Sequence, residues 1–266
     1  TSGWWRQQNP HFVPQRDADQ EIEAGRQPGL RALVIYPMNA LVEDQLSRLR
    51  SALDTPEIEQ FRAESGAGRI YFGKYTGATP RAGNVHDQDA VDKGRRELAE
   101  ELRRTERIRQ NAEVWVDDAE GEERDRRAEN LTFFPRSDGS EMRTRWDMQL
   151  ACPDILITNS SMLSIMLMRE QEDRIFEQTR DYLKQEGAKL HIVMDELHLS
   201  RGSSGSEMAY LMRTLLARLD LTPDDERLRI ISSSASLEEA EGRQFLSQFF
   251  GREAEDFRIF NGDLER

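Results

Sequence analysis

Two adjacent carboxylates follow a short apolar run in the segment HIVMDELHLSRG, residues 191–202. Asp195 and Glu196 come directly after Ile192–Met194, where a buried strand would end. Magnesium prefers oxygen ligands and keeps several waters, so one carboxylate suffices when phosphates supply further oxygens. A second acid can orient or deprotonate an attacking water, and phosphoryl transfer depends mostly on such positioning. The pair therefore indicates a magnesium–nucleotide site, and the alternative is a solvent-exposed strand end.

Strands and helices alternate along most of the chain, which predicts an α/β fold. Strands are expected at 31–37, 69–75, 153–159, 189–194 and 227–236, with a last one at 256–262, and helices at 39–53, 160–170, 205–219 and 238–251. This alternation is typical of a parallel sheet with helices on both faces. Ligands of such sheets bind at the carboxyl ends of the strands. The fold would therefore place Asp195 and Glu196 at the ligand-binding edge.

The segment 81–149 interrupts this alternation. Residues 92–113 form an intensely charged helical pattern with weak apolar periodicity, and residues 117–130 contain almost no apolar side chains. This composition predicts a solvated helical insertion with a flexible acidic link. A strand-separating or partner-docking element is the alternative. Residues 1–30 are expected to be irregular, with the aromatic side chains of GWWRQQNPHF either packed or forming a partner contact.

Composition excludes several classes of protein. No apolar run among the 266 residues approaches the roughly 18 that a membrane span needs, so no membrane partner is expected. Cys152 is the only cysteine, which excludes an internal disulfide and favours a cytoplasmic, reducing compartment. The net charge of −13 argues against a chain-wide basic footprint for nucleic acid, but not against contacts through backbone amides and hydroxyls.

Four segments resemble the motifs of superfamily 2 helicases, and they occur in the order of that family. VMDELH looks like the DExH form of motif II. IYPMNALVEDQ (35–45) is similar to motif Ia, PDILITNSSML (153–163) to motif Ib and SSSAS (232–236) to motif III. The run from Asp195 to Leu219, together with GKYTGATP, resembles the bacterial Mrf-type repair helicases and the DISARM anti-phage helicase. The resemblance covers roughly residues 31–80 and 142–262.

The resemblance implies most of a RecA-like first motor domain, over 31–262, that uses ATP and Mg²⁺. Asp195 would hold magnesium, through water, and Glu196 would orient or deprotonate the hydrolytic water. His198 would link the nucleotide site to motif III, where Ser234 and Ser236 would relay the state of the nucleotide.

DNA, as a single strand or a duplex end, is the implied partner, together with a second RecA-like domain and another defence or repair subunit. The residues expected along the phosphates of one strand are Pro37, Asn39, Thr76, Gly77, Thr158 and Asn159. Arg201 would contact phosphate or couple the domains, or else form a salt bridge at a helix end. TNSSML lacks the proline usual in motif Ib, so the path of the strand past Ser160 is left open.

A motor of this family needs a phosphate-binding loop, G-x-x-x-x-G-K-[ST], before motif Ia. Gly68, Gly73 and Lys74 match its spacing in GRIYFGKY, but bulky strand formers fill the middle and Tyr75 replaces the magnesium-binding hydroxyl. We reject this match and expect a segment of a larger protein, with residues 263–266 beginning a linker. Such a segment would be inactive alone. One alternative is a non-catalytic RecA-like scaffold or partner-binding module. A metal-dependent nuclease would need further carboxylates at the site.

Overall fold

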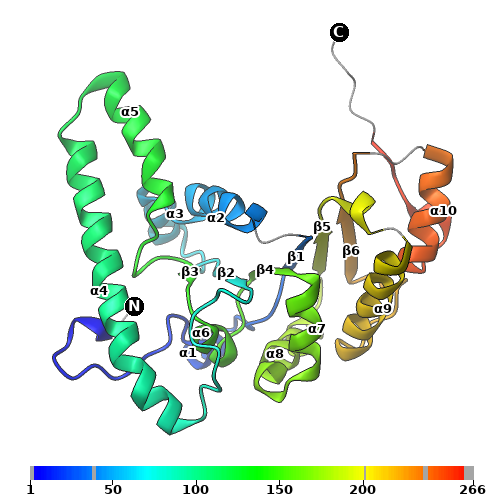
Figure 1. Ribbon diagram of the computed structural model, residues 1–266, viewed down its shortest axis with the longest axis horizontal. Helices are drawn as coiled ribbons and strands as arrows, with labels where there is room; N and C mark the ends of the chain where they lie inside the picture. Colours follow the sequence, from blue (N-terminus) through cyan, green and yellow to red (C-terminus); the bar gives the residue numbers. More distant parts are fainter. Residues whose placement is uncertain (1–2, 38–39, 201, 236–238, 261–266) are drawn as a thin grey trace.

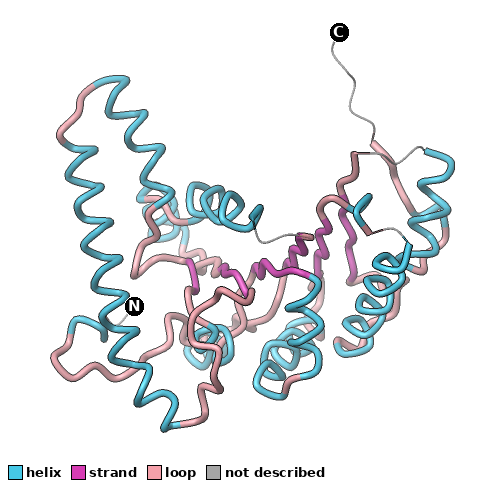
Figure 2. Tube along the Cα trace, in the orientation of Figure 1, coloured by secondary structure: helices cyan, strands magenta, loops and turns pink. Residues whose placement is uncertain are grey.

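A computed structural model describes residues 3–37, 40–200, 202–235 and 239–260. Six parallel strands form one sheet in the order β3-β2-β4-β1-β5-β6, shown in magenta in Figure 2. The strands are β1 (Ala32–Tyr36), β2 (Phe72–Tyr75), β3 (Glu141–Met142), β4 (Ile155–Asn159), β5 (Leu190–Met194) and β6 (Leu228–Ser232). The predicted α/β fold with a parallel sheet is confirmed.

Helices cover both faces of the sheet (Figure 1). Helices α2 (Ala40–Leu53) and α3 (Pro56–Ser65) lie on one side. The other side carries α1 (Ala18–Glu23), α6 (Arg145–Leu150), α7 (Ser160–Met168), α8 (Asp173–Leu183) and α9 (Gly202–Arg218), and α10 (Glu239–Phe250) packs on α9. Short 3-10 helices span Trp4–Arg6, Leu131–Phe133, Glu170–Glu172, Leu197–Leu199 and Ala254–Asp256.

Side chains of β1 alternate between the two faces of the sheet and join the core on each face. Leu33 and Ile35 point into the larger cluster with α7 to α10, whereas Tyr36 packs with Val42 and Leu46 of α2. Successive side chains of a strand face opposite sides, so a strand that is apolar at nearly every position must be covered twice. The apolar run that predicted this strand is therefore explained by its place in the middle of the sheet.

The segment 81–149 differs from its prediction. Helix α4 (Gln88–Asp117) pairs with α5 (Gly121–Asn130) in an antiparallel hairpin at the β3 end of the sheet (Figure 1). The predicted flexible link over 117–130 is wrong for most of its length, because α5 is a helix held by ion pairs such as Arg127–Glu123. The end of the segment also contributes the strand β3 to the sheet and most of the buried helix α6 to the layer beneath it.

The strand predicted at 256–262 is also wrong within the described residues. Residues 257–260 are irregular and pair with no strand. Phe257 packs instead on Phe250, with ring centroids 6.1 Å apart, and its carbonyl accepts a hydrogen bond from Arg243. Residues 261 and 262 lie outside the described residues.

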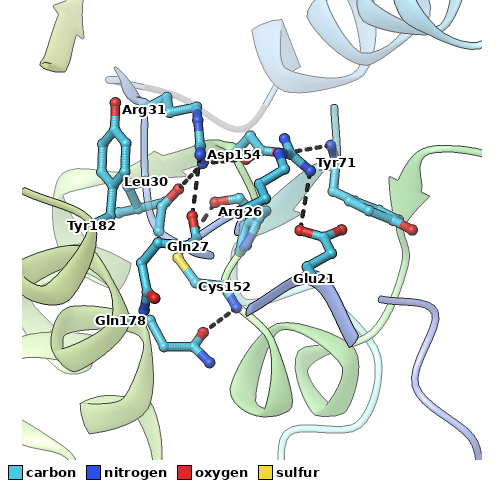
Figure 3. Close-up of polar contacts among 12 residues, drawn as sticks. Glu21, Arg26, Gln27, Leu30, Arg31, Tyr71, Cys152, Asp154, Gln178 and Tyr182 are labelled. Carbon is cyan, nitrogen blue, oxygen red and sulfur yellow. Dashed lines mark hydrogen bonds and ion pairs between the residues drawn. The ribbon is translucent and has the colours of Figure 1, made fainter. Parts of the chain in front are cut away.

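The N-terminal segment is held at two places, against α4 and α6 and at the sheet. Trp4 and Trp5 are buried in a cluster with Trp146 and α4, which confirms packed aromatics over a surface patch. At the amino ends of β1 and β4, the buried Asp154 carboxylate accepts from three arginines, Arg16, Arg26 and Arg31. Figure 3 shows Arg26 and Arg31 beside Asp154. Apart from α1 and its one 3-10 helix, the segment has no regular structure among its described residues.

No helix of the described residues is long and apolar enough to cross a bilayer.

Candidate functional site

The register of the sheet lines up the expected site residues along one edge. Tyr75 pairs with Thr158, Tyr36 with Asn159, and Ile35 with Met194, so the strands end at nearly the same height. The residues at their carboxyl ends are, in spatial order, Thr76 and Gly77 after β2, Thr158 and Asn159 at the end of β4, Pro37 after β1, Asp195 and Glu196 after β5, and Ser233 and Ser234 after β6. Neighbouring strands lie about 4.8 Å apart, so this row spans roughly 19 Å.

The two carboxylates of the DExH segment meet the end of β6 through Ser233. The Ser233 hydroxyl donates to Asp195 Oδ1, and the Glu196 amide lies 3.1 Å from the same oxygen and 3.3 Å from Ser233 Oγ. The Leu197 amide donates to the Ser233 carbonyl at 2.9 Å. Both the backbone and the side chain of Ser233 therefore hold the turn that carries the acids.

Glu196 occupies an unusual backbone conformation, with φ 54° and ψ 42°. Residues other than glycine seldom enter this left-handed region, and they concentrate at functional sites when they do. The turn redirects the chain from β5 into the 3-10 helix Leu197–Leu199. The start of α9 then approaches closely, because a Cβ at Gly205 would overlap the Ser200 carbonyl oxygen. Glycine at 205 thus lets the helix support the turn.

His198 lies between the DExH turn and the segment after β6. Its Nδ1 is 3.2 Å from Glu196 Oε2 and 3.4 Å from the Ala235 amide nitrogen. A protonated Nδ1 donates to Glu196, whereas an unprotonated Nδ1 accepts from Ala235, so the proton decides which partner is bonded. This placement matches the expected position of His198 between the two motifs.

The phenol of Tyr36, on the neighbouring strand β1, is affected by the charge of Asp195. Burial raises the pKa of its phenol, and the negative charge of Asp195 raises that pKa further. Tyr36 and Asp195 both line a cavity of about 900 Å³ that opens beside the acids.

The predicted phosphate contacts have mixed placements. Thr158 is fully buried, and its hydroxyl donates to the Tyr75 carbonyl at 2.7 Å. The expectation that this hydroxyl faces a nucleic-acid strand is wrong in this structure, because the hydroxyl is bonded to the neighbouring strand of the sheet. Asn159 caps α7 by accepting from the Met162 amide at 2.8 Å. Thr76 is buried, with its amide donating to Thr79 Oγ1, whereas Gly77 is exposed.

Three expected residues, Asn39, Arg201 and Ser236, lie outside the described residues. Ser234 and Pro37 are partly exposed at the edge. Sequence reasoning missed Ser233, which contacts Asp195 directly. The predicted strand ran to residue 236 and so included Ser233, whereas β6 ends at Ser232 and leaves Ser233 as the first residue beyond it.

The donor set suits magnesium only in the presence of phosphate. Carboxylate and hydroxyl oxygens are the hard ligands that Mg²⁺ prefers. No group of three or more His, Cys, Asp or Glu side chains among the described residues could hold a metal. Asp195 would thus provide one ligand position, and nucleotide phosphates and water would have to provide the others.

The segment that imitates a phosphate loop is not one. Gly73 and Lys74 belong to β2, and the Lys74 ammonium group pairs with Glu43. A strand directs alternate amides to its two neighbours, so it cannot wrap successive amides around a phosphate. The rejection of this match is confirmed.

Comparison with known proteins gives one similar curated protein and several solved structures. The chain is 36% identical over 271 residues to Druantia protein DruE of Escherichia coli (strain UMEA 4076-1), which covers 90% of this chain and 14% of DruE. No protein-family model matches. The chain therefore spans about one seventh of the length of this relative.

The similar solved structures include those of the DUF1998 helicase MrfA. The crystal structure with DNA and AMPPNP shares 19% identity at a TM-score of 0.41, covering 91% of this chain and 26% of that one. The crystal structure with DNA alone shares 19% identity at a TM-score of 0.40, covering 91% of this chain and 25% of that one.

Proposed function

We propose that this chain is part of the motor of an ATP-dependent helicase or translocase that acts on DNA. The observation that carries the proposal is the division of the carboxyl edge into two parts. The acids and serines lie on β5 and β6, and the motifs expected on the nucleic-acid backbone lie on β2, β4 and β1. A nucleotide and a strand could thus occupy the same edge side by side. DNA repair or anti-phage defence is the proposed setting, from the motif resemblance.

The roles of the acids follow from their contacts. Asp195 Oδ1 is engaged by Ser233 and the Glu196 amide, which leaves Oδ2 for magnesium or its water. Magnesium nucleotide, when bound, supplies the phosphoryl group and charge neutralisation. Glu196 is partly exposed and can accept a proton from water, while His198 holds its carboxylate from one side.

The proposal is tested by replacing Glu196 in the full-length protein. Loss of a general base typically lowers turnover by about 10²–10⁴-fold, so Glu196→Gln should reduce kcat for ATP hydrolysis by that factor. Glu186→Gln is the matched control, because Glu186 is an exposed acid in the loop before β5, at the opposite edge of the sheet. Unchanged turnover in Glu196→Gln would overturn the assignment.

A non-catalytic RecA-like scaffold is the second candidate. The lack of a phosphate loop in these residues would support it only if the full-length protein also lacks one. Equilibrium binding of a fluorescent ATP analogue to the full-length protein discriminates the two. The motor requires magnesium-dependent binding that weakens in Asp195→Ala, whereas a scaffold should bind no nucleotide.

A further inference from the structure

A groove runs between α7 and α9, below the carboxyl edge of the sheet, where Figure 1 shows the two helices side by side. Its volume is about 900 Å³. The floor is apolar and buried, with Ile35, Met194 and Met208. Helix α7 has nine residues, so the groove can run for roughly 14 Å along it, about two and a half helical turns.

The rim of the groove exposes large apolar side chains. Met168 and Tyr210 are each 78% exposed, and Leu199 is 51% exposed. They come from α7, from α9 and from the 3-10 helix after the DExH turn, so the exposure converges from separate elements. Isolated exposed apolar residues are ordinary, whereas a group around a hollow marks an interaction site. Methionine on both floor and rim suits a surface that adapts to its partner.

The charge of the groove selects the chemistry of the partner. Its described lining residues include two acids, Asp195 and Glu207, and no Lys, Arg or His. The other polar groups are mainly hydroxyls, such as those of Ser164 and Ser204. Nucleic-acid phosphates placed here would meet carboxylates without a cation, which disfavours a strand. A partner with apolar side chains and positive charge complements the groove.

We propose that the α7–α9 groove binds a basic amphipathic helix of a partner protein. Leucine-like side chains at i, i+3, i+4 and i+7 fill the Met-rich floor, as in other helix-in-groove complexes. Basic residues beside them face Glu207 and, at the upper end, Asp195. The groove meets the carboxyl edge at Pro37 and Asp195 and extends away from it between the two helices, and its occupant adds a protein partner to the proposed motor.

The experiment uses the full-length protein and a fluorescein-labelled peptide, about four helical turns long, of leucine and lysine, with leucine at helical spacing. A matched leucine–glutamate peptide and a labelled oligothymidine are the comparison probes. Fluorescence anisotropy should show the lysine peptide binding at least about tenfold more tightly than the glutamate peptide, because the charged side chains in the described lining of the groove are both acids. Glu207→Gln should weaken the lysine peptide and reduce the salt dependence of its binding.

Removal of the rim decides whether binding occurs in the groove. Met168→Ser combined with Tyr210→Ser should weaken the lysine peptide at least about tenfold, because the rim side chains supply apolar contact. Phe61→Ser combined with Phe133→Ser is the matched control, because these phenylalanines are 60% and 62% exposed on other elements. Circular dichroism verifies the fold of both variants. Equal binding of the two peptides, or wild-type binding by the rim variant, overturns the proposal. Loss of oligothymidine binding in the rim variant alone would instead assign the groove to nucleic acid.

Discussion

At the scale of single residues, the hydrogen bond from Ser233 to Asp195 joins the ends of two strands. A hydroxyl that fixes one carboxylate oxygen leaves the other free in a defined direction. Ser233→Ala in the full-length protein should therefore raise the magnesium concentration for half-maximal ATPase activity about tenfold. That factor corresponds to about 1.4 kcal/mol, within the range for a hydrogen bond to a charged group after discount for exposure.

The control for this prediction is Ser232→Ala, one residue earlier on β6, where the side chain is exposed. Magnesium titrations at saturating ATP measure both variants. A loss of kcat with unchanged magnesium dependence in Ser233→Ala would show that the serine does not position Asp195.

Glu172 gives a prediction for stability against pH. This side chain is fully buried, and its carboxylate accepts from the Tyr75 hydroxyl at 2.6 Å. Burial raises the pKa of Glu172 above the ordinary value of about 4.3, so the folded state binds a proton more tightly than the unfolded state. The contribution of the group is then fully present below the unfolded pKa and is lost as pH rises through the folded pKa.

Glu172→Gln removes that titration. The free energy of unfolding of the wild type, minus that of Glu172→Gln, should increase as pH falls from about 7 towards about 4.5. Urea unfolding across this range measures the difference. Glu170→Gln is the control, since Glu170 is exposed two residues away and should show no such trend. A difference that grows with rising pH would contradict the sign.

The positions of the candidate site residues were predictable from sequence only where they are set by the end of a strand. Asp195 and Glu196 follow an apolar run, so their place at the edge could be read directly. The burial of Thr158 could not, because its hydroxyl is satisfied by the carbonyl of Tyr75, 83 positions away. A threonine at a strand end looks the same in the sequence whether its hydroxyl is buried in a hydrogen bond or exposed to solvent.

At the scale of elements, strands covered on both faces were predicted to within three residues at each end, except at the carboxyl end of β6. Continuous apolar runs mark β1, β4 and β5 because helices cover both of their faces. The two-residue strand β3 has no comparable run and was missed. Helix α5 was missed because none of its residues is buried, so no apolar periodicity remains in its sequence.

The contacts of Asp154 that hold the N-terminal segment against the sheet give a prediction for stability. Asp154 Oδ2 accepts from the Tyr71 amide at 2.8 Å and from Arg26 Nη2 at 2.9 Å, while Oδ1 faces the buried Arg16. Asp154→Asn would direct amide hydrogens at donors and break the buried Arg16–Asp154 ion pair, which leaves Glu21, at 2.7 Å, as the carboxylate partner of Arg16. Breaking a buried ion pair costs about 3–5 kcal/mol, so the free energy of unfolding should fall by that amount.

Urea denaturation monitored by tryptophan fluorescence tests this loss. Asp181→Asn is the control, because Asp181 is an exposed acid on α8 whose ion pair with Lys184 should contribute less than about 1 kcal/mol. Equal stability of the two variants would show that Asp154 is not needed to hold the segment.

At the scale of the whole molecule, a net charge of −13 opposes the approach of nucleic acid. Two described cations near the nucleic-acid part of the edge are already engaged. Lys74 pairs with Glu43, and the buried Arg145 donates to the Thr76 carbonyl at 2.7 Å. Contacts from this part of the edge must then come mainly from amides and hydroxyls, which release few counterions and carry no base information.

The 266-residue chain should therefore bind single strands weakly, with a dissociation constant above about 10⁻⁵ M at physiological salt, in the non-specific range. Each phosphate neutralised on a single strand adds about 0.7 to the slope of log affinity against log salt, so the slope should remain below about 0.7. Anisotropy titrations of oligothymidine and oligoadenosine of equal length, across a range of salt concentrations, measure both quantities. A slope of about 1.4 or more would mean that at least two cations reach the phosphates, and a preference for one oligonucleotide would mean that bases are read. Either result would contradict the expectation that backbone amides and hydroxyls make most of the contacts with nucleic acid. Cationic or base-contacting side chains would then have to lie in the segments after β1 and before α9.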